Sequence, residues 1–288
     1  FTETNSNRPA AEPYTVPWSE YLPWIQLHSN GTTLSNRRLG WNYVADRVEN
    51  GLKQSFILSQ RVDEWIKNGP EGELPLARHL FYKVNEQLTS FQTNRGFGQD
   101  ATHTLLTGEG NSLVLLKAVY DIAGLDSDIY LAKSRLANQQ VSPLHPLSNY
   151  GVGILRLQLD DGTTKWLNPR GRYAMFNAVS LTILGQDAVC VTCRQLKTST
   201  LPGKDGFRRA ERRIDISGEL SERGDFKGTI QANIGGIRAN VIRQRLARSN
   251  GSGNERDYIR QILSGILPSA NLESFEVANR RALDEALT

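Results

Sequence analysis

The stretch Gly108-Glu109-Gly110-Asn111-Ser112 carries residue types that could do chemistry: a glycine-flexed turn that opens directly into an apolar helix. Such a junction is where α/β and α+β enzymes often hold a nucleophile. A serine hydroxyl is far less acidic than a thiol, so Ser112 would need a base positioned against it. Ser and Asn are also favoured at helix N-caps, because their side-chain oxygens accept hydrogen bonds from unpaired backbone N–H groups. A structural role that needs no chemistry is therefore open to Ser112.

Two histidines are candidates for that base. His103 lies in the polar, glycine-punctuated segment Phe91–Thr107 that leads to Ser112, and His145 lies just before a predicted strand. An acyl-transfer enzyme, a peptidase or amidase, would need one imidazole about 3 Å from the serine hydroxyl. We favour the simpler interpretation that both are loop-surface histidines between threonines or prolines.

Cys190 and Cys193 form a second suggestive spacing, C-x-x-C, which is typical of metal and redox sites. The Val and Thr residues around them predict a strand over Ala188–Thr192, and residues three apart in a strand point to opposite faces. The chain has 2 cysteines in all, and its 4 histidines lie far from them in the sequence. We therefore expect neither zinc nor thioredoxin chemistry, and no metal or cofactor elsewhere.

The elements that must position these residues begin with a helical front half. Apolar residues at helical spacing predict helices over Trp41–Gln60, Ser59–Lys67 and Leu76–Leu88. The segment Phe91–Thr107 is expected to be a surface loop. The helix Ser112–Ala123 is apolar on most sides, so it is expected to be buried, and Gly124 ends it.

The middle of the chain changes from helical to alternating periodicity. The predicted strands are Ile129–Ala132, Gly153–Leu159, Thr163–Leu167, Ser180–Leu184 and Ala188–Thr192. Asp160-Asp161-Gly162 between two of them is a strong hairpin signal. An antiparallel sheet that follows a helical half indicates an α+β fold.

The last part of the chain reads as a small α+β module. The predicted strands here are Arg213–Leu220, Asp225–Ala232 and Leu272–Val277, and the predicted helices are Ile237–Ala247 and Glu255–Leu263. We divide the chain into a polar lead (1–16), a core (17–200), a linker (201–210) and this module (211–288). The module is expected to begin a further C-terminal region.

The composition and charge balance of the chain bear on the kind of partner that it could bind. The 288 residues are 39% hydrophobic and 22% charged, with 34 Lys+Arg against 30 Asp+Glu. The basic clusters Arg208–Arg213 and Arg243, Arg245, Arg248 are interpreted as a solvated linker and a solvated helix face, so a nucleic-acid partner is not expected. No transmembrane segment is predicted. The chain begins at Phe1 without a signal pattern, which indicates a processed protein or an excised segment.

Three motifs in this order resemble the bacterial transglutaminase-like superfamily, which has a papain-like fold. Thr107–Ser112 stands where the family has G-x-G-D-C, Leu157–Gly162 resembles its hairpin, and Lys165-Trp166-Leu167-Asn168-Pro169 resembles its W-L-D-P. The resemblance spans roughly 17–191. It is closest to the envelope-associated branch, where domains of unknown function flank the core, and the final module also resembles the module that follows the core there.

The resemblance implies a degenerate catalytic triad. Ser112 stands in place of the nucleophilic Cys, Val152 or Gly151 in place of the His, and Asn168 in place of the orienting Asp. Asn168 can hold geometry but cannot stabilise an imidazolium as a carboxylate does. The implied function is a catalytically inactive binding or assembly module of a larger bacterial envelope protein, located in the periplasm or cell envelope.

A cleft between the helical half and the sheet is also implied. Its expected lining is Asn111, Ser112, Tyr150, Gly151, Trp166 and Asn168. Such a cleft would take a protein or extended peptide, or a cell-wall fragment. The alternative hypothesis is an active acyl-transfer enzyme that uses Ser112 with His103 or His145. A weaker one is an anionic polymer bound by the arginine-bearing module.

Overall fold

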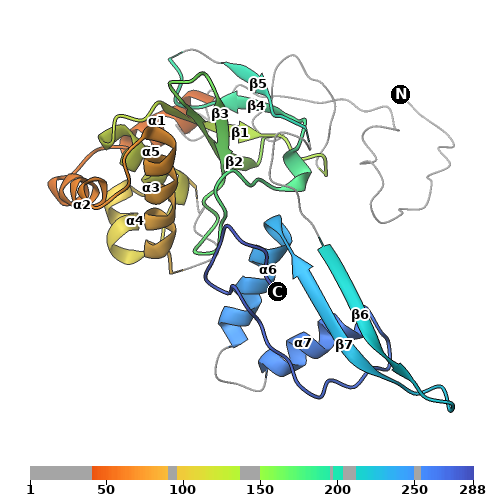
Figure 1. Ribbon diagram of the computed structural model, residues 1–288. Coiled ribbons are helices and arrows are strands. Elements are labelled where there is room, and N and C mark those ends of the chain that lie inside the picture. Colours follow the sequence, from red (N-terminus) through yellow and green to blue (C-terminus); the bar gives the residue numbers. More distant parts are fainter. Residues whose placement is uncertain (1–40, 90–95, 137–149, 195–196, 204–211, 250–253) are drawn as a thin grey trace, which may run out of the picture.

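The computed structural model describes residues 41–89, 96–136, 150–194, 197–203, 212–249 and 254–288. Within them, a layer of helices packs on a five-stranded antiparallel sheet, and a long two-stranded hairpin with two helices follows (Figure 1). The α+β class predicted from the change in periodicity is confirmed.

The helical layer consists of α1 to α5. Their bounds are α1 Trp41–Gly51, α2 Phe56–Lys67, α3 Glu73–Gln87, α4 Ala101–Thr107 and α5 Ser112–Ile122. The α5 helix is central, because it contacts α2, α3, α4 and the sheet. Of its 11 residues, 8 are buried, as its apolar circumference predicts.

The sheet has the strand order β3-β2-β1-β4-β5, with every neighbouring pair antiparallel. Its strands are β1 Ser127–Ala132, β2 Val152–Gln158, β3 Thr164–Leu167, β4 Asp187–Cys190 and β5 Thr198–Thr200. The predicted hairpin is confirmed: Gly162 adopts φ +82° and donates its N–H to the Leu159 carbonyl at 2.9 Å. That positive φ is the conformation for which glycine is favoured.

Alternation along the strands gives the sheet two buried faces. One face packs against the helices through residues such as Leu131, Leu155 and Leu167. The other face carries Tyr130 and Trp166 and is covered by the segment around Ile183, among others. The two faces therefore belong to separate hydrophobic clusters, and the functional candidates divide between them.

Gly153 lets the first turn of α5 approach β2 closely. A Cβ added at Gly153 would lie 2.4 Å from Leu113 Cδ1. Leu113 follows Ser112, so the residue next to the candidate site packs directly over Gly153.

Two predictions for the helical half are wrong. The continuous helix expected over Trp41–Gln60 is broken, because the Ser55 hydroxyl accepts a hydrogen bond from Leu58 N at 3.1 Å and starts α2 anew. The segment Phe91–Thr107, expected as a loop, contains α4. The Asp100 side chain caps that helix by accepting from His103 N at 2.6 Å.

Two predicted strands are also absent from the described residues. Ser180–Leu184 contains the 3₁₀ helix η3, Leu181–Ile183, which the Ser180 hydroxyl caps. Leu272–Val277 pairs with no strand; instead the Arg256 guanidinium donates to the carbonyls of Leu272 and Glu273 at 2.6 and 3.0 Å. The Arg256 side chain therefore supplies the hydrogen bonds that a neighbouring strand would have supplied to these carbonyls.

The final module contains the hairpin β6 Arg212–Leu220 and β7 Phe226–Ile234 and the helices α6 Gly236–Ser249 and α7 Asn254–Ser264. Its small core includes Ile234, Ala239, Leu246 and Leu287. Arg243 on α6 is buried and donates to the carbonyls of Asn279, Ala282 and Glu285 at 3.1, 2.9 and 2.8 Å. The expectation of a solvated basic helix face is therefore wrong at Arg243.

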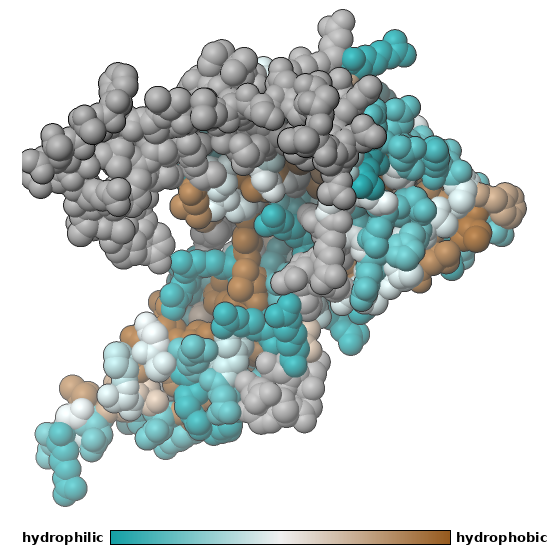
Figure 2. Space-filling view, turned by 180° about the vertical axis from the view of Figure 1, so that it is seen from behind, coloured by the Kyte–Doolittle hydropathy of each residue, from teal (hydrophilic) through white to brown (hydrophobic). Residues whose placement is uncertain are grey.

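One face of the hairpin carries no polar side chain from the pair Ile214–Ala232 to the pair Leu220–Phe226. The cross-strand pairs on that face are Ile214 with Ala232, Ile216 with Ile230, Gly218 with Gly228, and Leu220 with Phe226. Ala232 packs on the module core, whereas Ile216, Leu220 and Phe226 are 47%, 71% and 48% exposed. The intervening residues on the other face are polar. Hydrophobic surface is visible along the hairpin in Figure 2. We call this surface the β6–β7 apolar face.

Candidate functional site

Asn111 and Ser112 occupy the start of α5. Asn111 is the N-cap: its Oδ1 accepts from Leu113 N at 3.0 Å and from Val114 N at 3.3 Å. Its Nδ2 donates to the Gly96 carbonyl at 2.6 Å. Ser112 is the first helical residue, and its side chain is fully buried. The capping role that the sequence left open to Ser112 therefore belongs to its neighbour.

Gly151 stands just before β2, at one of the two positions where the resemblance expects the catalytic histidine. The pairing of Ala132 with Val152, continued by one residue, sets Gly151 opposite Lys133 on the helix side of the sheet. A Cβ added at Gly151 would meet no atom of the described residues within 4 Å. The strand position that faces α5 thus has no side chain.

Lys133, which the register sets opposite Gly151, is a cation that the sequence analysis did not single out. The residue is only 5% exposed, and its Nζ lies 5.3 Å from the centre of the Tyr150 ring. Among the described residues, no carboxylate forms an ion pair with this ammonium group. Asp187 is its strand neighbour, accepting from Lys133 N through the backbone carbonyl at 2.9 Å.

Tyr150 is buried between this lysine and Trp41, whose ring centre lies 5.3 Å away in an edge-to-face arrangement. Burial raises the pKa of the Tyr150 hydroxyl to about 12, and the nearby Asp187 charge contributes to the increase. The phenol is therefore neutral at physiological pH.

The structure does not gather all six expected cleft residues. Trp166 lies on the sheet face away from α5, with its ring centre 5.2 Å from that of Tyr130. Asn168 is 5% exposed, and its Oδ1 is buried without a hydrogen-bond partner in the described part of the chain. Asn111, Ser112, Tyr150 and Gly151 lie on the helix side of the sheet, so the predicted lining is corrected at Trp166.

Neither candidate histidine is shown to serve Ser112. His103 is exposed on α4, and the contacts of the described residues include no hydrogen bond from its imidazole to the Ser112 hydroxyl. His145 lies outside the described residues.

Cys190 and Cys193 are joined by a disulfide, which corrects the expectation that they face apart. Strand β4 ends at Cys190 and the chain bends over 191–194, so the alternation rule no longer applies at Cys193. Cys190 is 3% exposed, whereas Cys193 is partly exposed.

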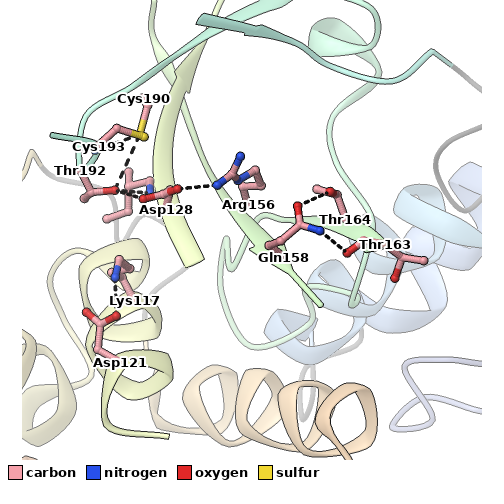
Figure 3. Close-up of polar contacts among 11 residues, drawn as sticks. Lys117, Asp121, Asp128, Arg156, Gln158, Thr163, Thr164, Cys190, Thr192 and Cys193 are labelled. Carbon is pink, nitrogen blue, oxygen red and sulfur yellow. Dashed lines mark hydrogen bonds and ion pairs between the residues drawn. A yellow bond between two sulfur atoms is a disulfide. The ribbon is translucent and has the colours of Figure 1, made fainter. Parts of the chain in front are cut away.

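A polar network surrounds this disulfide (Figure 3). The Thr192 hydroxyl donates to Asp128 Oδ1 at 3.1 Å and accepts from Ile129 N at 3.0 Å. The other Asp128 oxygen forms an ion pair with Arg156 at 2.7 Å, and both side chains are mostly buried. Asp128 and the two sulfurs offer ligand atoms that all lie within 4.8 Å of one another. The sulfurs are bonded to each other, however, and are not thiolates in this state.

The first basic cluster is only partly described. Arg212 and Arg213 lie on β6 and, with Asn233, Gly235 and Ala286, line a hollow of about 500 Å³. Arg213 is engaged with Asp215 at 3.0 Å. Arg208 and Arg209 lie outside the described residues. The described part of the chain has no helix that is both long and apolar enough to cross a membrane.

Comparisons with known proteins identify no family. No model of a protein family matches the sequence, and no curated protein matches it. A solved structure described as a "putative protease" from Parabacteroides distasonis ATCC 8503 is similar at 11% identity, with a TM-score of 0.42. The similarity covers 62% of this chain and 36% of the Parabacteroides chain. The matched region is therefore about a third of the length of that protein. At this TM-score it carries no argument about function.

Proposed function

We propose that the chain is a catalytically inactive domain of the transglutaminase-like, papain-like class. In this proposal it serves as a binding or assembly module of a larger bacterial envelope protein. The observation that carries the proposal is the fully buried Ser112 side chain, together with a glycine, Gly151, at one of the two positions where the resemblance expects the catalytic histidine. A buried hydroxyl is poorly accessible to a substrate, and glycine supplies no imidazole to activate it.

Binding at the same end of the sheet is supported by Lys133. The buried Lys133 ammonium group lies over the Tyr150 ring and has no ion-pair partner among the described carboxylates, so it is costly to keep desolvated. A carboxylate of a bound peptide would offset that cost. We therefore favour a protein or extended peptide over a neutral cell-wall saccharide.

The β6–β7 apolar face supports a protein partner as well. Ile234, at the end of β7, forms a bridge with Leu287, but the two-stranded sheet pairs with no third strand among the described residues. Its edges near exposed Leu220 and Phe226 are therefore open to an added strand. Such a strand from a partner would pair with the backbone groups of the edge and cover the apolar side chains.

The periplasm or cell envelope is the proposed location. A disulfide such as Cys190–Cys193 is typical of oxidising compartments, which supports that proposal.

Activity assays with Ser112→Ala test the inactive-domain proposal. Hydrolysis and amine transfer are measured on a peptide library, with an acylating probe to label any nucleophile. We expect no turnover and no labelling of wild type above the Ser112→Ala background. Turnover that is lost in Ser112→Ala would contradict the proposal and support the acyl-transfer alternative.

A photo-crosslinking pair tests the partner surface. A photoreactive residue is placed at Leu220 on the apolar face or at Glu219 on the polar face, in the full-length protein in its own cells. We expect a discrete protein adduct from position 220 and none from position 219. Only the side chain at 220 lies on the β6–β7 apolar face, which the partner would cover. Equal adducts from both positions would count against this face.

A further inference from the structure

The geometry points to the Cys190–Cys193 disulfide as a thiol-exchange site, at which an external thiol attacks Cys193 and Cys190 leaves. The two cysteines differ in exposure. Cys190 is 3% exposed inside the cluster that includes Tyr130 and Trp166, whereas Cys193 packs against the edge of the same cluster from the bend and is partly exposed. A thiol arriving from solution therefore reaches the sulfur of Cys193.

A backbone donor is aimed at the sulfur that leaves. Cys193 N donates a hydrogen bond to Cys190 Sγ at 3.0 Å. A disulfide sulfur is a weak acceptor, whereas a thiolate is a strong one, so this bond strengthens as negative charge develops on Cys190. The amide is already in position before the reaction, and the leaving thiolate needs no rearrangement to be stabilised.

Asp128 sets how readily that charge develops. Its ligand oxygen lies within 4.8 Å of both sulfurs, so its negative charge opposes a thiolate on Cys190. Arg156 offsets part of this charge through the 2.7 Å ion pair. Thr192 Oγ1 lies 3.9 Å from Cys190 Sγ while it donates to Asp128. The Asp128 charge therefore slows reduction of the disulfide by disfavouring the Cys190 thiolate.

The bond is not required to hold β4 in the sheet. The strand pairs with β1 and β5, and Cys190 N and Val191 N donate to the carbonyls of Lys197 and Ile129 at 2.8 and 2.9 Å. The disulfide closes a loop between residues only 3 apart in sequence, and short loops gain the least from the loss of chain entropy on cross-linking. Reduction can therefore leave the strand in place, which makes the exchange reversible.

The reaction balances with a thiol as co-reactant. An external thiolate forms a bond to Cys193 Sγ, the Cys190–Cys193 bond breaks, and Cys190 departs as a thiolate that then takes a proton from water. A second external thiol attacks the mixed disulfide at the external sulfur, which releases an oxidised external disulfide and the Cys193 thiol. The protein is reduced by two electrons, and two thiols are oxidised. The substrate class is a small thiol of the glutathione type or a protein dithiol.

The experiment measures exchange with glutathione by mass spectrometry of the folded protein. With wild type, we expect complete reduction by an excess of glutathione and re-formation of the bond with oxidised glutathione, with unchanged far-UV circular dichroism. Two single-cysteine variants are treated with oxidised glutathione, which forms a mixed disulfide with a free thiol and releases one reduced glutathione. Cys190→Ser leaves Cys193 as the single thiol and should form this adduct. Cys193→Ser leaves the buried Cys190 alone and should form little adduct until the protein is unfolded.

Asp128→Asn is the variant that separates an exchange site from an inert cross-link. Removing the negative charge stabilises the Cys190 thiolate and should speed reduction by on the order of threefold. Thr200→Val, which removes a hydroxyl bonded to Asp187 on the neighbouring strand, serves as a control and should leave the rate unchanged. Resistance of the wild-type bond to glutathione, or equal adduct formation at Cys190 and Cys193, would overturn the proposal.

Discussion

The Tyr82 hydroxyl donates a 2.7 Å hydrogen bond to Asp284 Oδ1 and thereby joins helix α3 to a segment 202 residues later in the chain. The same hydroxyl accepts from Phe176 N at 3.4 Å, and Arg78 lies 4.0 Å from the other Asp284 oxygen. Burial, with the Asp284 carboxylate adding to it, raises the pKa of Tyr82 well above its ordinary value. The helical layer and the C-terminal module are therefore connected through a protonated phenol.

Tyr82→Phe should lower the free energy of unfolding by about 1 to 2 kcal/mol, because a hydrogen bond to a charged acceptor is lost while the ring is retained. Urea unfolding measures the change. In a double-mutant cycle with Asp284→Asn, the two effects should be non-additive by about 1 kcal/mol. Additive effects would show that the two side chains do not interact in solution.

Asn111→Ala should destabilise the protein by about 1 to 2 kcal/mol, since it removes the cap of α5. Asn111→Ser keeps an acceptor for the cap and loses only the amide that donates to Gly96, so its cost should be smaller. Thermal unfolding of the two variants provides the measurement. An equal loss in both would show that the Gly96 contact, and not the cap, is what matters.

Stability should fall in alkali partly because of Tyr150. Its pKa is about 12 in the folded protein, raised by burial, and about 10 when unfolded. The unfolded chain therefore releases this proton first, so the contribution is complete below about pH 10 and is lost as the pH rises towards 12. Urea titrations across this range should show a shallower decline for Tyr150→Phe. An unchanged slope would contradict the assignment.

Arg243→Met should loosen the end of the chain, because three carbonyls lose their shared donor. The expected cost is about 3 kcal/mol. Arg243→Lys keeps the charge but not the forked geometry, so it should rescue only part of this loss. Hydrogen exchange of residues 279–288 is the measurement, and protection equal to wild type in Arg243→Met would contradict the role.

Local signals predicted the parts of the fold that depend on few residues. The hairpin at Asp160-Asp161-Gly162 was predictable because the turn itself demands a residue with positive φ. The central helix from Ser112 was predictable because an apolar circumference suits a helix buried on most sides. The α4 helix was missed although Asp100 and Gly108 mark its two ends, since its seven residues are too few to show a clear period.

The remaining features depend on contacts between distant residues. No local pattern shows that Lys133 lies opposite Gly151, because that depends on the register of two strands. Arg243 looks like a surface residue until its acceptors, 36 to 42 positions later, are known. The cysteine spacing was misjudged because the alternation rule holds only inside a strand, and the point where β4 ends is set by its neighbours.

Gly153 has a practical consequence for anyone who maps this site by mutagenesis. Alanine scanning removes side chains and would leave a glycine untouched, or treat Gly153→Ala as a minor change. An added methyl group at this position would meet Leu113 Cδ1 at 2.4 Å, and the buried Leu113 side chain would have to move to relieve the overlap. The packing of the first turn of α5 on β2 thus depends on a residue without a side chain, which a survey of polar residues alone would overlook.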